Sequence, residues 1–214
     1  LLYKIALILT PKVGPITAKK LYHHFGSAKS VYETEIKDLV YSGIINKDTA
    51  QELNKKENFG FAEEEIKFMD KYGIKALCFD DPEYPKRLKH YEDSPFLIYF
   101  KGDCNLNSTR IISIVGTRKP TEYGRQQCES VIEALKEYNA IIISGLAFGI
   151  DGCAHQKCVE LGIPNIGVVA HGLDRIYPPS HTKLAHKMIK GGGGILSEFP
   201  SRTEPMPCNF PSRN

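Results

Sequence analysis

The feature that most constrains the fold of this chain is a regular alternation of apolar strands and amphipathic helices after residue 110. Strands are expected over four segments, Ile111–Val115, Ala140–Ile143, Asn165–Ala170 and Gly194–Ser197. Helical patterns separate them, over Thr121–Tyr138, Ile150–Leu161 and Lys183–Ile189. Strands that are apolar throughout and are joined by helices favour a parallel sheet covered on both faces, with right-handed connections. We therefore predict an α/β fold for this part of the chain.

The N-terminal part of the chain has a different secondary-structure pattern. Residues 1–72 predict a small all-helical module, with an apolar segment at Lys4–Leu9 and helices over Pro15–Phe25, Glu35–Tyr41 and Asp48–Tyr72, the last broken at Gly60. Short strands at Ala76–Phe79 and Phe96–Phe100 lead into the alternating region. We expect two domains, a helical module over 1–72 and an α/β domain over 73–214. Since only four clear parallel strands precede Asn214, we expect the second domain to be incomplete at its C-terminal end.

Composition limits the classes of function. The net charge is +3, with 16 basic and 16 acidic residues in 1–103 and 12 basic and 9 acidic residues in 104–214. A polyanion site must therefore rest on placed groups rather than on a bulk field. No apolar run of about 18 residues predicts a membrane span. The six cysteines form no C-x-x-C pair, so we expect neither a disulfide framework nor a zinc site, and a cytoplasmic location.

Two turns after strands suggest a phosphate-binding edge. The segment Ser113–Arg118 ends a strand in Gly-Thr-Arg, where Gly116 allows close approach of a backbone and Arg118 offers forked donors. The segment Ser144–Asp151 follows the next strand and places Ser144 and Gly145 at the same edge. Neither turn is the G-x-G-x-x-G dinucleotide fingerprint. The simpler alternative is a pair of tight turns with a solvated arginine.

Three further features have both functional and ordinary interpretations. Phe210 and Arg213 join an aromatic face to a cation, the combination that single-stranded nucleic acid requires, although Phe210 taken alone is more typical of a core. The segment Val13–Leu21 resembles a helix-hairpin-helix element, and an ordinary helix–helix turn is the simpler interpretation. His155 invites a catalytic or metal-binding role, but a hydrogen-bonded structural histidine is the commoner case.

Taken together, these segments resemble the DprA/Smf family. The lead-in Asp81-Pro82-Glu83-Tyr84-Pro85, the Gly-Thr-Arg turn, Ser-Gly-Leu-Ala-x-Gly-Ile-Asp, Gly-Leu-Asp-x-x-Tyr-Pro and Asn-Phe-Pro-x-Arg-Asn match in order and spacing over about residues 10–214. The resemblance implies a Rossmann-like domain that binds single-stranded DNA without sequence specificity and has no catalytic centre and no cofactor. Carried over by motif, the binding residues are Gly116, Arg118, Ser144, Gly145, Phe210, Arg213 and Asn214.

The resemblance also implies partners and one departure. It implies loading of RecA during natural transformation and recombination, and a homodimer at full length. The family's surfaces for both lie largely beyond the part of the domain seen here. The family often has a basic residue before its Asn-Phe-Pro motif, whereas this chain has Glu204-Pro205-Met206-Pro207-Cys208. We expect that difference to weaken one phosphate contact.

Two other classes of function remain open. Phosphoribohydrolases of the lysine-decarboxylase-like type cleave nucleotides at the same sheet edge and carry a Pro-Gly-Gly-x-Gly-Thr-x-x-Glu motif. The run Gly191–Gly194 does not match that motif. A pure protein adaptor is the third class, and it predicts no binding of nucleic acid.

Overall fold

The computed structural model describes residues 1–213. For Ser212 and Arg213 it describes the backbone but not the side chains. The chain divides into two compact units, Leu1–Ile98 and Tyr99–Asn214. The division falls inside strand β2 (Leu97–Gly102). The division of the chain into a helical module over 1–72 and an α/β domain over 73–214 stays a prediction.

The first unit is rich in helices, as the sequence predicts. They are α1 (Leu2–Ile8), α2 (Pro15–Phe25), α3 (Ala28–Glu33), α4 (Ile36–Tyr41), α5 (Lys47–Lys55) and α6 (Asn58–Tyr72). Strand β1 (Lys75–Cys78) and a 3-10 turn η1 (Leu88–His90) follow. The expected helix Pro15–Phe25 is confirmed to the residue, with Gly14 as its N-cap and Gly26 in the left-handed conformation as its C-cap.

Two details of this unit differ from the prediction. Helix α3 was not expected; its start is fixed by Ser27, whose side chain accepts a hydrogen bond from the Ser30 N–H. The break in the last helical segment lies at Lys56, not at Gly60. Lys56 adopts a left-handed conformation, φ +55°, and so ends α5. Gly60 lies in the first turn of α6, where a glycine interrupts little.

The second unit contains the predicted parallel strands. They are β3 (Ile111–Ser113), β4 (Ile141–Ser144), β5 (Asn165–Val169) and β6 (Gly194–Ser197). Over the described residues the sheet has six strands in the order β1-β2-β6-β5-β4-β3. The pairs β3–β4, β4–β5 and β5–β6 are parallel, and β2 joins β6 in the antiparallel direction. The α/β, Rossmann-like fold class is confirmed.

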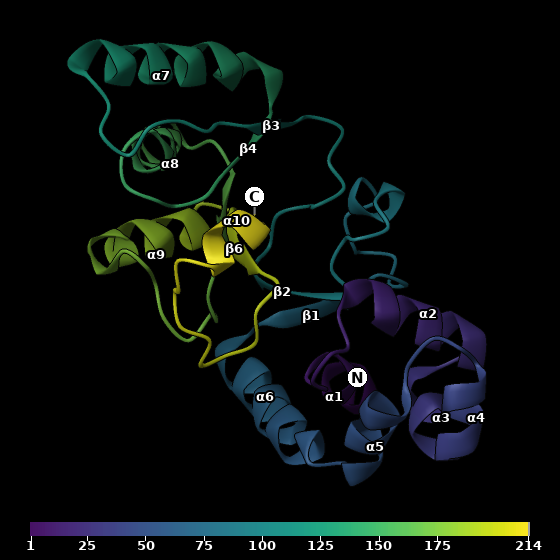
Figure 1. Cartoon of the computed structure of the whole chain (residues 1–214). Coiled ribbons are helices and arrows are strands. Elements are labelled where there is room, and N and C mark those ends of the chain that lie inside the picture. The colour runs from purple at the N-terminus through teal and green to yellow at the C-terminus, as the bar shows by residue number, and fades with distance from the viewer. Residues whose placement is uncertain (214) are drawn as a thin grey trace. The chain divides into compact units, whose positions relative to one another are not determined.

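Helices α7 (Glu122–Leu135), α8 (Ile150–Leu161) and α9 (Thr182–Lys190) cross between these strands. The 3-10 turns η2 (Lys136–Tyr138) and η3 (Pro179–His181) flank them. Figure 1 shows α8 and α9 side by side, and α7 packs on α8. The strands follow one another in sequence order, so right-handed crossovers place these three helices on one face, whereas the sequence pattern predicted helices on both faces.

That shared face holds the core of the unit. Ile112 and Ile142 pack in one cluster with Cys128, Ile132 and Ala154 of α7 and α8. Val169 and Ile195 pack in a second cluster with Leu184 and Met188 of α9. Because side chains alternate along a strand, Ser113, Ile143 and Val168 face the opposite side of the sheet.

The C-terminal stretch after β6 was not predicted to contain a helix. Its last residues form a short helix, α10 (Asn209–Arg213). Asn209 anchors the start of this helix, because its side-chain amide donates to the Glu204 carbonyl at 3.1 Å and, more weakly, to the Ala170 carbonyl at 3.4 Å. The helix is thereby held at the end of β5. No helix in residues 1–213 combines the length and the apolarity needed to cross a bilayer.

Candidate nucleic-acid interface

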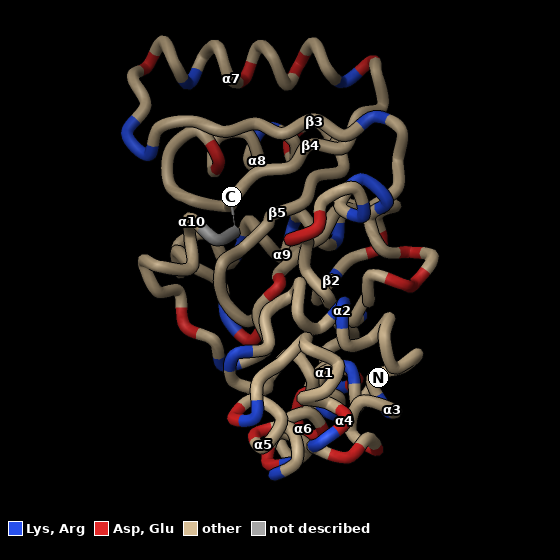
Figure 2. The backbone as a smooth tube through the Cα atoms, turned by 45° about the vertical axis from the view of Figure 1, so that its right-hand side comes forward, with Lys and Arg blue, Asp and Glu red and all other residues tan. Residues whose placement is uncertain are grey.

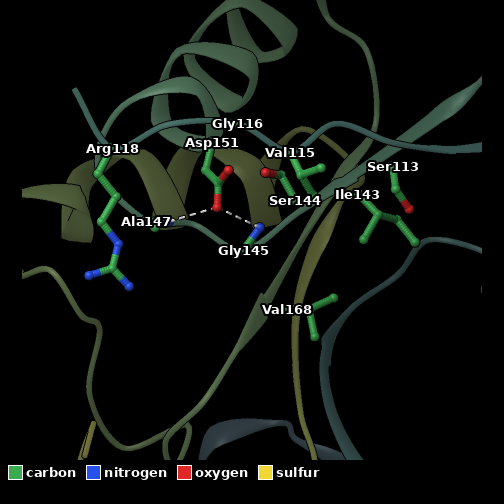
Figure 3. Close-up of a pocket in the computed structure, with 10 residues that line it drawn as sticks. All are labelled: Ser113, Val115, Gly116, Arg118, Ile143, Ser144, Gly145, Ala147, Asp151 and Val168. Carbon is green, nitrogen blue, oxygen red and sulfur yellow. Dashed lines mark hydrogen bonds between the residues drawn. The ribbon is translucent and has the colours of Figure 1, made fainter. Parts of the chain in front are cut away.

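The loops that follow β3 and β4 meet at the carboxyl edge of the sheet, where they enclose a cavity of about 490 Å³ (Figure 3). The lining comes from three strand ends and two turns: Ser113, Val115, Gly116, Arg118, Ile143, Ser144, Gly145, Ala147, Asp151 and Val168. Of the predicted site residues, Gly116, Arg118, Ser144 and Gly145 are therefore brought together. The side chains of Ser113, Ile143 and Val168 come from the face that α7, α8 and α9 leave open, whereas that of Ser144 lies on the helix side.

The first turn, residues 114–121, packs on the start of α8. A Cβ added to Gly116 would lie 2.6 Å from Cγ1 of Ile150, and the Ile150 N–H donates to the Thr117 carbonyl at 3.1 Å. Helix α7 begins four residues after Arg118, at Glu122, and the N-terminus of α8 packs against this turn. Gly116 is needed for that close packing.

The second turn holds an acidic side chain that sequence reasoning gave no role. The Asp151 carboxylate accepts hydrogen bonds from the N–H groups of Gly145 at 3.1 Å and Ala147 at 3.4 Å (Figure 3). An anion at a helix N-terminus is favourable, and at the start of α8 the Asp151 carboxylate is that anion. These two N–H groups are therefore engaged by Asp151, and Gly145 contributes to the cavity mainly by lacking a side chain.

Ser144 differs from the other strand residues of the lining, because its side chain lies on the helix-covered side of the sheet, as that of Ile142 does two residues earlier. Only 3% of the residue is exposed. Its hydroxyl has no hydrogen-bond partner among the described residues. A buried hydroxyl without a partner costs free energy, and this one has almost no surface that a ligand in the cavity could reach.

An aromatic and cationic cluster borders the cavity on its Arg118 side. The Arg118 guanidinium lies 5.5 Å from the centre of the Phe210 ring, and the Tyr177 ring lies 6.1 Å from it at an interplanar angle of 39°. Phe210 is half-buried rather than part of the core, and Tyr177 is 43% exposed. Tyr177 was not among the predicted site residues, although its place in Gly-Leu-Asp-x-x-Tyr-Pro was the signal that could have found it.

The loop after β5 is fixed so that Tyr177 keeps its place. The Nδ1–H of His171 donates to the Gly172 carbonyl at 2.8 Å, and its Nε2 accepts from the Tyr177 N–H at 3.2 Å. Arg175 is engaged by acids of the chain, with Asp174 at 3.0 Å and Glu204 at 3.6 Å. Glu204, which lies in the stretch where the sequence departs from the family pattern, thus neutralises the charge of Arg175.

The side chains of two predicted site residues lie outside the described part of the structure. Arg213 lies in α10, and its side chain is outside the described residues. Asn214 lies outside the described residues altogether. Their roles in binding stay predictions.

His155 has a structural environment. It is completely buried, and its Nδ1–H donates to the Asn165 side-chain oxygen at 2.8 Å, while the Asn165 amide donates to the Ile163 carbonyl at 2.9 Å. Burial lowers the pKa of His155 to about 4, although the bond to Asn165 opposes the shift. The imidazole is therefore neutral at neutral pH and links α8 to β5.

We expect this histidine to make the fold sensitive to acid. Its pKa is near 6.5 in an unfolded chain and about 4 in the fold, so the unfolded state binds the proton more tightly. The neutral form stabilises the fold fully above pH 6.5, and up to about 3 kcal/mol is lost as the pH falls toward 4. Thermal melts across this range should show a steeper loss for the parent than for His155→Gln. Parallel pH profiles would contradict the assignment.

Comparisons with known proteins agree with this geometry. A family model described as DNA recombination-mediator protein A matches residues 75–214. The chain is 33% identical to Protein Smf of Synechocystis sp. over 220 residues, covering 99% of this chain and 54% of that protein. It is 40% identical to DNA processing protein DprA of Bacillus subtilis over 143 residues, 66% of this chain and 48% of that protein. The chain thus spans about half the length of these relatives.

Solved structures show the same likeness. The X-ray structure of DNA processing protein A from Streptococcus pneumoniae superposes with a TM-score of 0.80 at 26% identity, covering 100% of this chain and 72% of that one. DNA processing protein A from Helicobacter pylori gives a TM-score of 0.58 at 29% identity, covering 66% of this chain and 63% of that one. The description of the latter structure concerns its single-stranded DNA binding mode.

Proposed function

Because the chain belongs to the DNA recombination-mediator protein A family, the DprA/Smf family of its sequence relatives, we propose that its second unit binds single-stranded DNA with little sequence preference. One observation supports this most strongly, the cation–π contact of the Arg118 guanidinium with the Phe210 ring beside the cavity at the carboxyl edge. A cation and an aromatic face in contact supply the two elements of such a site, neutralisation of a phosphate and a surface on which a base stacks.

The proposed roles follow from the contacts. Arg118 donates to a phosphate with its forked N–H groups. Phe210 and Tyr177 offer rings to the neighbouring base. Ser144 is proposed as a site residue by its place in the family's motif. Gly145 contributes space, since its N–H is engaged by Asp151. Arg213 and Asn214 are proposed to extend the site by their place in the family's motif alone.

Single-stranded DNA suits this arrangement better than duplex. Stacking on Phe210 and Tyr177 requires a base whose face is free, whereas the bases of a duplex are covered by their neighbours. Figure 2 shows acidic and basic positions mixed along α7 and through the helices of the first unit. Binding thus depends on the placed groups at the sheet edge, as the balanced charge of the sequence predicts.

We further propose that the protein has no nucleotide-cleaving activity. Among the residues that line the cavity, the titratable ones are Arg118 and Asp151. Asp151 is occupied by two backbone N–H groups, and His155 is buried against Asn165. Neither is placed as a general base toward the cavity. Loading of RecA and formation of a homodimer are proposals that rest on family membership.

The proposed function predicts selective, salt-dependent binding. Fluorescence anisotropy with a mixed-sequence single strand and its duplex should show tighter binding of the single strand. Affinity should fall with added salt, because phosphate neutralisation releases counterions. Single strands of different sequence should bind within a few-fold of one another. Equal affinity for both forms, or binding to neither, would refute the proposal, and release of free base from nucleoside monophosphates would favour a hydrolase.

A further inference from the structure

A second cavity, of about 460 Å³, opens on the other side of the turn that follows β4. Side chains of α7, α8, α9 and the turn line it. Its basic lining residues are Arg125, Lys157, Lys183 and Lys187, and its acidic ones are Glu129 and Glu160. The site described above uses none of these side chains, so this cavity needs an explanation of its own.

The most unusual side chain of this cavity is Phe148. It is 50% exposed. Its ring lies 5.4 Å from that of His181 at an interplanar angle of 67°. His181 is itself fixed, because its Nδ1–H donates to the Leu146 carbonyl at 2.9 Å and its ring packs against Gly152. Phe148 is thus held on a rigid support with half of its surface in solvent.

The wall beside Phe148 is basic. Helix α9 contains Lys183, Lys187 and Lys190 and no acidic residue. Lys183 and Lys187 are four residues apart, so they lie on one side of the helix, about 6 Å apart along its axis. Both are exposed, and neither has an ion-pair partner among the described residues. By contrast, Lys157 pairs with Glu133, and Glu160 accepts a hydrogen bond from Gln156.

The two cavities adjoin each other through the turn. Ala147 lines the first cavity, and Phe148 and Gly149 line the second. Arg118, which lines the first cavity, packs closely on Gly149, because a Cβ there would lie 2.6 Å from its Cα. A ligand that leaves Arg118 along this turn therefore meets Phe148 next and then the lysines of α9.

We propose that this second cavity is an extension of the DNA site, in which a base of a longer single strand stacks on Phe148 and its phosphates lie on Lys183 and Lys187. The inference rests on the proposed function, since it takes the same ligand farther along the surface. An aromatic ring with unpaired cations at its side is the arrangement that binds a single strand whatever its sequence. This proposal gives Phe148 a role in binding that the Ser144–Asp151 motif alone did not indicate.

The test compares two lengths of oligothymidylate, one of about six nucleotides and one of about 20. In the parent protein the longer strand should bind more tightly and with a steeper salt dependence. Phe148→Ala should weaken binding of the longer strand about fivefold or more. The double variant Lys183→Ala/Lys187→Ala should lower the salt slope of the longer strand by about two. Both should leave the shorter strand nearly unchanged.

Matched controls come from the far end of α7. Tyr138→Ala removes an aromatic ring that is 58% exposed, and Lys136→Ala removes an exposed lysine; neither residue lines the cavity, and neither change should affect either strand. If Phe148→Ala and the double lysine variant bind the longer strand as the parent does, the extension is refuted and the first site stands. Equal losses for both strands also refute a separate extension. Failure of the parent to bind either strand refutes both proposals.

Discussion

Replacing Gly149 by alanine should weaken binding of single-stranded DNA at least tenfold and lower the stability of the fold. Gly149 has φ +86° and ψ −129°, a conformation that side chains do not tolerate. Its added Cβ would lie 2.1 Å from the Thr117 carbonyl oxygen and 2.6 Å from Cα of Arg118. The turn 116–118 must move away, and Arg118 moves with it. Strain of this kind costs about 2–4 kcal/mol.

Gly162→Ala is the matched control for this change. Gly162 also has a positive φ, +70°, at the end of α8, but nothing lies within 4 Å of the Cβ it would gain. This variant should lose about 1 kcal/mol of stability and no DNA affinity. Thermal melts and anisotropy titrations of the two variants separate the effect of backbone strain on stability from the effect on DNA binding of moving the turn 116–118. A Gly149→Ala protein that binds DNA as tightly as the parent would show that the position of the first turn does not matter for binding.

The sheet was predictable because its signals are local. The strands around Ile112, Ile142 and Val168 are continuous apolar runs, and each is followed by a helix with an apolar stripe. That pattern allows few topologies, and the parallel order of β3 to β6 is one of them. The helix Ile150–Leu161 and the strand Gly194–Ser197 were predicted to the residue, since a glycine stands just before the helix and another just after it, and a third opens the strand.

The site was predictable only in part, because turns depend on contacts across the fold. Sequence spacing placed Gly116 and Gly145 near a phosphate, but Gly116 is required by Ile150 and the Gly145 N–H is taken by Asp151. No local pattern shows which helix start a turn will meet. Tyr177 was overlooked as a binding residue for the same reason, since its proximity to Phe210 joins the loop after β5 to a helix 30 residues later.

Replacing Arg118 by alanine should lower the affinity for single-stranded DNA about 10- to 100-fold. The change removes a charge-assisted contact with phosphate, worth about 1.5–3 kcal/mol, and the cation stacked on Phe210. Arg118→Lys should restore only part of the loss, because an ammonium makes no forked contact and stacks less well on a ring. Stability should change by less than about 0.5 kcal/mol, since the side chain is exposed.

The salt titration of DNA affinity for the parent, Arg118→Ala and Lys136→Ala tests most directly whether the carboxyl edge of the sheet is the DNA site. Lys136 is also an exposed cation and lies in η2, just after the C-terminal end of α7, so its loss changes the net charge equally without touching the site. We predict that Arg118→Ala lowers the slope of log affinity against log salt by about one and that Lys136→Ala leaves it unchanged. Equal slopes for all three proteins, each with an unchanged thermal melt, would mean that the DNA binds elsewhere.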